Sequence, residues 1–73
     1  MSNIKYLRLE HHLTQGELAK LIGVSPQTLS NWERGYTEPD IKSLQKLASN
    51  LGTTIDYLIG LKETDQMSLL LIA

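Results

Sequence analysis

Two complete sets of helix start and stop signals follow one another in the stretch TQGELAKLIGVSPQTLSNWERG. Thr14, with a glutamate three residues later, predicts a capping box, and Gly23 is the kind of residue that ends such a helix. Ser25 predicts the next N-cap, and Pro26 suits the first helical position because the N–H that it lacks is not needed there. Gly35 ends the second helix. The stretch therefore predicts two short helices joined by a tight turn.

The rest of the chain is also patterned as helices. Apolar residues recur at spacings of three and four, without the sustained alternation that is typical of a strand. The expected N-caps are Ser2 or Asn3, Asp40 and Thr54. In the first helix one face is shared by Ile4, Leu7, Arg8 and His11, although both histidines are expected to be capping or surface groups. The expected inner face of the second helix is Leu18, Ala19 and Ile22. The fourth helix has one apolar stripe, formed by Ile41, Leu44, Leu47, Ala48 and Leu51. We therefore expect an all-α, compact five-helix bundle with helices over residues 4–11, 15–22, 26–34, 41–51 and 55–59.

Composition limits the size and chemistry of this bundle. A chain of 73 residues makes one small domain, and without cysteine it has neither a disulfide nor a thiolate metal site. The two histidines, His11 and His12, are adjacent and do not make a metal site. The formal charge of -1 weakly disfavours indiscriminate binding to polyanions, although basic residues can still gather on one surface. No catalytic set or glycine-rich phosphate loop is present, so we expect neither an enzyme nor a cofactor.

Residues 62–73 form a tail that is polar at first and then apolar. Its longest apolar run, LLLIA, is far shorter than the ~20 residues of a membrane span, and the N-terminus lacks a signal-peptide pattern. We therefore expect a soluble, cytoplasmic protein. The sequence MSLLLIA is too apolar to lie comfortably in water, so we expect it to dock at a dimer interface or on its own core. A disordered tail is the alternative.

The helix expected at residues 26–34 has two different faces. At 100° per residue, Leu29 and Trp32 fall on the side expected to face the core. The opposite side presents two amides, a hydroxyl and a guanidinium, from Gln27, Asn31, Thr28 and Arg34. These groups can read base edges or hold phosphates. The alternative is an ordinary solvated helix face, since Gln, Thr and Asn are common surface residues.

Spacing within the two helices favours the DNA-binding interpretation. A helix-turn-helix needs a small residue where its helices cross, a glycine in the turn, and an apolar residue that fixes the angle of the second helix. Counted from Gln15 as the first position, Ala19 is the fifth, Gly23 the ninth and Leu29 the fifteenth. All three requirements are met.

Residues 4–60 resemble the XRE-type helix-turn-helix family of lambdoid phage repressors and Cro proteins. The resemblance is carried by LTQGELAKLIGVSPQTLSNWERG, with PD, LQKLASNLG and TTIDYLIG behind it. It implies a DNA-binding domain over residues 1–61, with the helix at 26–34 in the major groove. It also implies a homodimer that binds a palindromic operator in double-stranded DNA and acts as a sequence-specific transcriptional regulator, of the phage or mobile-element repressor type.

Carried over position by position, the resemblance gives several residues an expected role. The expected base-contacting residues are Gln27, Thr28 and Asn31. The expected backbone-contacting residues are Gln15, Ser25, Arg34, Tyr36 and Lys42. The expected dimer interface consists of Ile55, Leu58, Ile59 and Leu61.

Arg8 lies on the apolar face of the first helix, where a charge needs a partner. Glu33 points inward from the helix at 26–34 and can supply one, and the matching residues form a pair in the family that the chain resembles. We therefore expect a structural ion pair between Arg8 and Glu33. The alternative is that Arg8 extends its guanidinium to water.

Some positions depart from the family pattern. His12 stands where glycine or asparagine is most common, which predicts some backbone strain. Pro26 replaces a glutamine that reads a base in several phage repressors, so one hydrogen bond of the reading edge is missing. Leu9 and Leu21 occupy positions that are usually polar. Together with the near-neutral charge, these leucines favour an alternative function, an antitoxin or protein-interaction module whose main partner is a protein such as a toxin or antirepressor.

Overall fold

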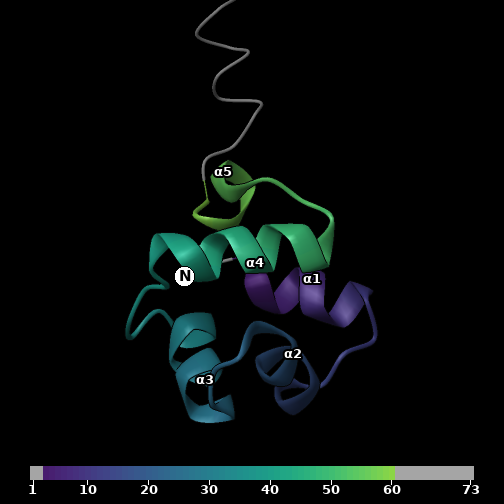
Figure 1. Cartoon of the computed structure of the whole chain (residues 1–73), viewed down its shortest axis with the longest axis vertical. Coiled ribbons are helices and arrows are strands. Elements are labelled where there is room, and N and C mark those ends of the chain that lie inside the picture. Colours follow the sequence, from purple (N-terminus) through teal and green to yellow (C-terminus); the bar gives the residue numbers. More distant parts are fainter. Residues whose placement is uncertain (1–2, 61–73) are drawn as a thin grey trace, which may run out of the picture.

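The computed structural model describes residues 3–60, which form five helices and no strand (Figure 1). The helices are α1 (Ile4–Glu10), α2 (Gln15–Ile22), α3 (Pro26–Arg34), α4 (Ile41–Leu51) and α5 (Ile55–Leu58). The all-α, five-helix fold expected from the spacing of apolar residues is therefore confirmed. Helices α1 and α5 each end one residue earlier than expected, because His11 and Ile59 take their C-cap positions.

The packing leaves α2 and α3 together at one end of the molecule. In Figure 1 these two helices lie side by side at the bottom, α4 crosses the middle, and α5 lies at the top. Helix α4 contacts α1, α2 and α5, and α1 also contacts α3. The α2–α3 pair is therefore packed against α1 and α4 on one side, and no other described helix covers its opposite side.

One apolar core joins all five helices. Its members are Ile4, Leu7, Leu18, Ala19, Ile22, Leu29, Trp32, Leu47, Leu51 and Leu58. Each helix contributes at least one buried apolar side chain, so even the four-residue α5 is held by burial rather than by its own hydrogen bonds.

The caps expected for α2 to α5 all form. Thr14 and Glu17 make a reciprocal capping box, with Thr14 Oγ1 accepting from Glu17 N at 3.0 Å and Glu17 Oε1 accepting from Thr14 N at 2.8 Å. Ser25, Asp40 and Thr54 each accept a hydrogen bond from the backbone N–H three residues later. These side chains satisfy backbone donors that the first turn of a helix leaves free.

The side-chain cap expected for α1 does not form. Asn3 occupies the N-cap position but makes no capping hydrogen bond. Its Nδ2 instead donates to the carbonyl oxygen of Tyr57 at 2.6 Å, so the side chain ties α1 to α5. Ser2, the other expected cap, lies outside the described residues. Helix periodicity cannot predict such a contact, because the two residues are far apart in sequence.

One further expectation about burial is wrong. Ile41 belongs to the predicted apolar stripe of α4, but 70% of it is exposed, because the core lies under the later turns of that helix. His11 is exposed, as a surface or capping group should be, and its Nε2 lies 3.1 Å from the carbonyl oxygen of Leu51 at the end of α4. Within residues 3–60, no helix is long and apolar enough to cross a membrane.

Candidate nucleic-acid interface

The turn between α2 and α3 has the geometry that its glycine predicts. Gly23 adopts the left-handed conformation, with φ at 84°, and its N–H donates to the carbonyl oxygen of Ala19 at 2.8 Å. A residue with a Cβ is disfavoured in this conformation. Ala19 itself is fully buried where the two helices pack, as is Leu29 on α3. The three positions predicted to set the helix-turn-helix angle therefore lie together in the structure.

The inner side of α3 fixes the helix on the domain. Leu29 and Trp32 are buried in the core, as their position on the helix predicts. Ser30 is also buried, although its type gives no sequence signal of burial. Because these side chains follow one another around the helix, α3 cannot rotate about its axis without exposing apolar surface.

A buried ion pair also holds α3 in place, in addition to the buried apolar side chains. Arg8 Nε donates to Glu33 Oε2 at 2.7 Å, and Arg8 Nη2 donates to Glu33 Oε1 at 3.1 Å. The side chains of Arg8 and Glu33 are only 9% and 3% exposed. The ion pair expected between them is therefore present, and its two-pronged geometry joins α1 to the last turn of α3.

The same network holds two further groups. Arg8 Nη1 donates to the carbonyl oxygen of Leu13 at 2.8 Å, which fixes the loop before α2. Gln15 Nε2 donates to Glu33 Oε1 at 2.9 Å. Gln15, expected to contact the DNA backbone, is thus tied to a buried carboxylate before any partner arrives. Its remaining amide N–H and its carbonyl oxygen are the groups left for such a contact.

The outer side of α3 carries a pair of amides. Gln27 Nε2 donates to Asn31 Oδ1 at 3.1 Å, in an exposed bond between residues one helical turn apart. After this bond is made, the pair still offers one carbonyl oxygen and free amide N–H groups. This remains true if both amides are turned over, because each amide carries a donor and an acceptor. Gln27 and Asn31, both expected to contact bases, therefore form one unit.

Thr28 and Ser25 lie beside this pair at the start of α3. Ser25 Oγ accepts from Thr28 N at 3.1 Å and lies 2.9 Å from Thr28 Oγ1. The hydroxyl of Ser25 is therefore used as a helix cap, and the hydroxyl of Thr28 is held against it. Both side chains are fixed at the N-terminal end of α3, where the helix dipole favours a negatively charged group.

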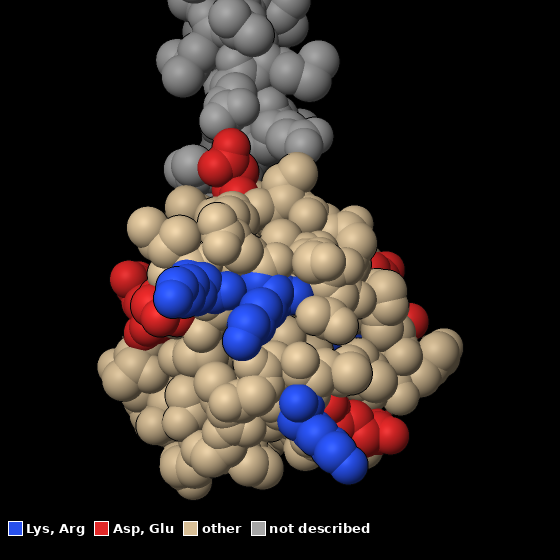
Figure 2. Space-filling view, in the orientation of Figure 1, with Lys and Arg blue, Asp and Glu red and all other residues tan. Residues whose placement is uncertain are grey.

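The residues expected to hold the DNA backbone lie on α3, α4 and the loop between them. Arg34 Cζ lies 5.9 Å from the centre of the Tyr36 ring, and both residues are exposed. Lys42 is exposed on the first turn of α4. Figure 2 shows basic side chains over α4 with acidic side chains next to them. Positive charge beside the amides of α3 therefore comes from Arg34 at the end of this helix and from Lys42 at the start of α4.

The two acidic caps are stabilised in their charged form. Hydrogen bonds with Thr14 lower the pKa of Glu17 below its ordinary value, the backbone bond contributing most. Hydrogen bonds from Ser43, first from its side chain and then from its backbone, lower the pKa of Asp40. Both carboxylates therefore stay ionised at neutral pH and complement the N-terminal ends of α2 and α4.

The expected dimer residues separate into different environments. Leu58 is 1% exposed and belongs to the core of the single chain. Ile59 is 53% exposed, and Ile55 is half-buried. Leu61 lies outside the described residues. Ile55 and Ile59 therefore remain as candidates for contact with a second copy.

Several of these contacts were missed from the sequence. The bond between Gln27 and Asn31 had a signal, because a Gln and an Asn four residues apart on a helix can bond to each other. The bond between Gln15 and Glu33 had none, since these residues come from different helices. Lys46 Nζ also approaches the carbonyl oxygen of Ile22 at 3.5 Å, a favourable place for a positive charge at the end of α2.

The fold and the α2–α3 geometry define a helix-turn-helix protein. Residues 4–58 match the family described as Helix-turn-helix, and the chain belongs to this family, in its XRE-type branch of phage repressor-like proteins. Membership places the chain among non-enzymatic regulators.

Relatives of the chain include regulators from archaea, bacteria and phage. The chain is 42% identical over 55 residues to an uncharacterized HTH-type transcriptional regulator, MJ0272, of Methanocaldococcus jannaschii, covering 75% of this chain and 83% of that protein. It is 38% identical over 64 residues to the cryptic phage CTXphi transcriptional repressor RstR of Vibrio cholerae, and the match covers 88% of this chain and 58% of that protein. It is 38% identical over 56 residues to repressor protein C2 of Salmonella phage P22, and the match covers 77% of this chain and 26% of that protein.

The structure is similar to a crystal structure of a transcriptional regulator from Listeria innocua. The TM-score is 0.73 at 29% sequence identity, and the match covers 96% of this chain and 71% of the other. The curated relatives differ in length, and the chain spans 50% of the transcriptional regulator ImmR of Bacillus subtilis, compared with 83% of the archaeal regulator.

Proposed function

We propose that this protein is a sequence-specific transcriptional regulator that binds double-stranded DNA through the outer face of α3. The observation that carries the proposal is the contrast between the two sides of this helix. Its inner side is buried in the core, and the outer side presents the hydrogen-bonded amides of Gln27 and Asn31 to solvent. A fixed helix with unpaired amide donors and acceptors suits the major groove, where each base pair presents a distinct donor and acceptor pattern.

The amide pair suggests which base is read. Adenine presents an acceptor, N7, beside a donor, the N6 amino group, and amide side chains bind this edge in two places. The coupled amides of Gln27 and Asn31 offer a carbonyl oxygen and an N–H on neighbouring side chains. We infer that the pair reads an adenine in an A·T base pair. Thr28, held against Ser25, offers its methyl group to a neighbouring base.

Contacts with the DNA backbone would come from the rim of this face. Gln15 is held by Glu33 at the start of α2, and Arg34 and Tyr36 stack beside the end of α3. Lys42 adds a positive charge at the start of α4. These groups hold phosphates without sequence preference and set the depth and angle at which α3 enters the groove.

Two copies are needed for a selective site. One copy offers few base-reading side chains, and a good two-point base contact discriminates by only ~1–3 kcal/mol. We infer a dimer on a palindromic operator, formed by the exposed Ile59 and half-buried Ile55. Since the named relatives include phage repressors, repression is the regulatory outcome that we propose.

Selection of bound sites from random duplex DNA tests this function. The expected result is a palindrome whose half-sites share an adenine, with two copies of the protein per site. Affinity for the selected site should fall steeply with rising salt, because phosphate contacts release counterions. Recovery of no preferred sequence, together with no retention of duplex at low salt, would contradict the proposal.

A protein-binding function on the same scaffold is the second candidate. Leu9 and Leu21 are each 54% exposed, on α1 and α2, and neither is among the residues assigned to the DNA contact. An antitoxin could use such leucines to hold its toxin while α3 binds DNA, so the two functions are compatible. Replacing both leucines by serine should leave DNA binding intact and abolish only a protein contact. Loss of DNA binding in this variant would count against a separate protein-binding surface.

A further inference from the structure

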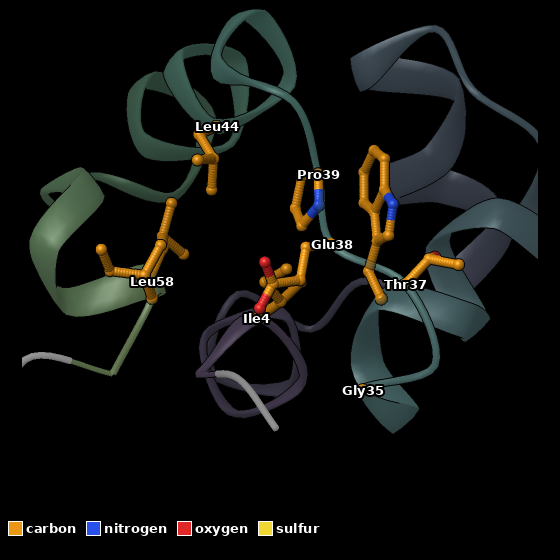
Figure 3. Close-up of a pocket in the computed structure, with 9 residues that line it drawn as sticks. Ile4, Gly35, Thr37, Glu38, Pro39, Leu44 and Leu58 are labelled. Atoms are coloured by element: carbon orange, nitrogen blue, oxygen red, sulfur yellow. The ribbon is translucent and has the colours of Figure 1, made fainter.

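A cleft of 330 Å³ opens on the side of the domain between α1, α4 and α5. Figure 3 shows Ile4, Leu44 and Leu58 pointing toward this space from the three helices, with Pro39 beside them in the loop before α4. Trp32 and Ile59 complete the apolar part of the lining, and Gly35, Thr37 and Glu38 contribute a polar part at the end of α3 and in the loop after it. The cleft takes no part in the DNA interface proposed above, so its apolar part calls for a separate explanation.

The size and chemistry of the cleft fit aliphatic side chains. An apolar cavity of ~150 Å³ holds one benzene molecule, so a cleft about twice as large holds about two groups of that size. Glu38 is the one charged residue in the lining, so the cleft is unsuited to a highly charged ligand. A short apolar segment that places two neighbouring side chains in the cleft is therefore the occupant with matching chemistry.

Such a segment follows at once in the chain. Ile59 belongs to the cleft lining, and the described structure ends one residue later, at Gly60. The next residues in the sequence are LKETDQMSLLLIA, a polar stretch followed by four consecutive large aliphatic residues, Leu69 to Ile72. The eight residues between Gly60 and Leu69 span at most ~29 Å when fully extended. This length is more than enough to return to a cleft at whose edge the segment begins.

We propose that side chains of residues 69–72 occupy this cleft on the same molecule. The short connection favours the chain's own segment over that of a second copy, because a short flexible linker holds its end at an effective concentration in the millimolar range. A separate molecule at micromolar concentration cannot compete with this. The contact would cover the exposed parts of Leu44 and Ile59, close over the remaining exposed edge of Trp32, and remove the LLLI run from water.

The proposal does not depend on DNA binding, but it does touch the proposed dimer. Ile59 is shared, since it lines the cleft and is also a candidate for contact with a second copy. A docked segment would leave Ile55 as the remaining dimer residue or would itself form part of the dimer surface. The test must therefore separate docking within one chain from docking between two.

Trp32 provides a direct probe, because it is the one tryptophan of the chain and lies in the cleft lining. Acrylamide quenching of its fluorescence would be compared between the full chain and the full-chain double variant Leu70→Ser, Leu71→Ser. We expect stronger quenching and a red-shifted emission in the variant, with an unchanged helical circular dichroism spectrum. The difference should stay constant on dilution through the range in which any dimer dissociates.

Matched variants control for a general effect of removing apolar groups. Ile59→Ser, at the edge of the cleft, should reproduce the change in Trp32 quenching. Ile41→Ser should not, because Ile41 is exposed but does not line the cleft. In the unmodified chain, nuclear Overhauser contacts should join the Ile72 or Leu69–Leu71 methyl groups to the Trp32 indole. Quenching that is equal in both proteins, a difference that vanishes on dilution, or absence of these contacts would each overturn the proposal.

Discussion

Helix α3 carries two polar clusters that differ in burial and in partners. Glu33, on its inner side, bonds to Arg8 of α1 and to Gln15 of α2, and its side chain is 3% exposed. Gln27 and Asn31, on its outer side, are bonded to each other and face solvent. The inner cluster joins three helices, whereas the outer one joins two residues of a single helix.

This difference separates the task of holding α3 from the task of reading with it. A buried charge depends on its partner, so the inner cluster contributes to stability and fixes the orientation of α3. An exposed amide pair adds little to stability, because water can replace either partner. Substitutions in the inner cluster should therefore unfold the domain, and those in the outer cluster should change binding in a folded domain.

The largest expected effect comes from breaking the inner cluster. Arg8→Ala leaves Glu33 buried without its charge partner, so we expect the free energy of unfolding to fall by about 3 kcal/mol. Urea denaturation followed by circular dichroism measures this loss. The double variant Arg8→Leu, Glu33→Leu should lose less, because no unpaired charge remains. A loss below about 0.5 kcal/mol for Arg8→Ala, the range of ordinary surface substitutions, would show that the pair does not hold α3.

Breaking the outer cluster should affect recognition and leave folding unchanged. For Gln27→Ala and Asn31→Ala we expect unfolding free energies within about 0.5 kcal/mol of the parent. Discrimination at one base pair of the selected site should fall by ~1–3 kcal/mol. Competition binding against duplexes altered at single positions measures this discrimination. A selected site that carries an adenine analogue lacking N7 should bind the parent protein more weakly than the unmodified site, and should bind the variants equally well. Gln45→Ala on α4 is the matched control, and a selected site unchanged by Gln27→Ala would contradict base reading.

The rim of the reading face should respond differently from its centre. Arg34→Ala removes one expected phosphate contact, so all duplex sequences should bind more weakly by a similar factor. The slope of log affinity against log salt should decrease by about 1. Lys20→Ala, at the far end of α2, provides a charge-matched control with no expected change of slope. A loss confined to one base position would instead assign Arg34 to base reading.

A smaller effect is expected at the end of α1. His12 is a non-glycine residue with φ at 57°. This conformation costs ~1–2 kcal/mol of free energy for a residue with a Cβ. Glycine avoids that cost, but the larger conformational freedom that it loses on folding costs ~0.5–1 kcal/mol. His12→Gly should therefore raise the unfolding free energy by roughly 0.5 kcal/mol, whereas His12→Ala should not. A destabilised glycine variant would indicate that the imidazole makes a contact that outweighs the strain.

The smallest expected effect is the pH dependence of the two acidic caps. The pKa values of Glu17 and Asp40 are lowered in the folded protein, so folding favours their charged forms. Their contribution is complete above the unfolded values of about 4 and is lost as the pH falls through the lower folded values. Asp40→Asn and Glu17→Gln keep a capping oxygen without a titrating group. Thermal melts below about pH 4 should therefore decline less steeply in these variants than in the parent.

Local signals predicted most of the fold. Thr14 with Glu17, Ser25 with Pro26, and Gly23 mark helix ends through groups only a few residues apart, so their effect does not depend on the rest of the chain. The faces of α3 followed from the same short-range geometry, which placed Leu29 and Trp32 in the core and Gln27 and Asn31 outside. Prediction failed at Ile41, where burial depends on how neighbouring helices are placed rather than on the helix itself.

The sequence by itself therefore determined the helices, their ends and the side of α3 that faces outward, because these follow from contacts within one or two turns. Only the tertiary structure decided that Gln15 bonds to Glu33, that Asn3 reaches Tyr57, and that Trp32 and Ile59 line one cleft. These contacts join residues distant in sequence. Their geometry depends on the packing of five helices around one core, and no local pattern encodes it.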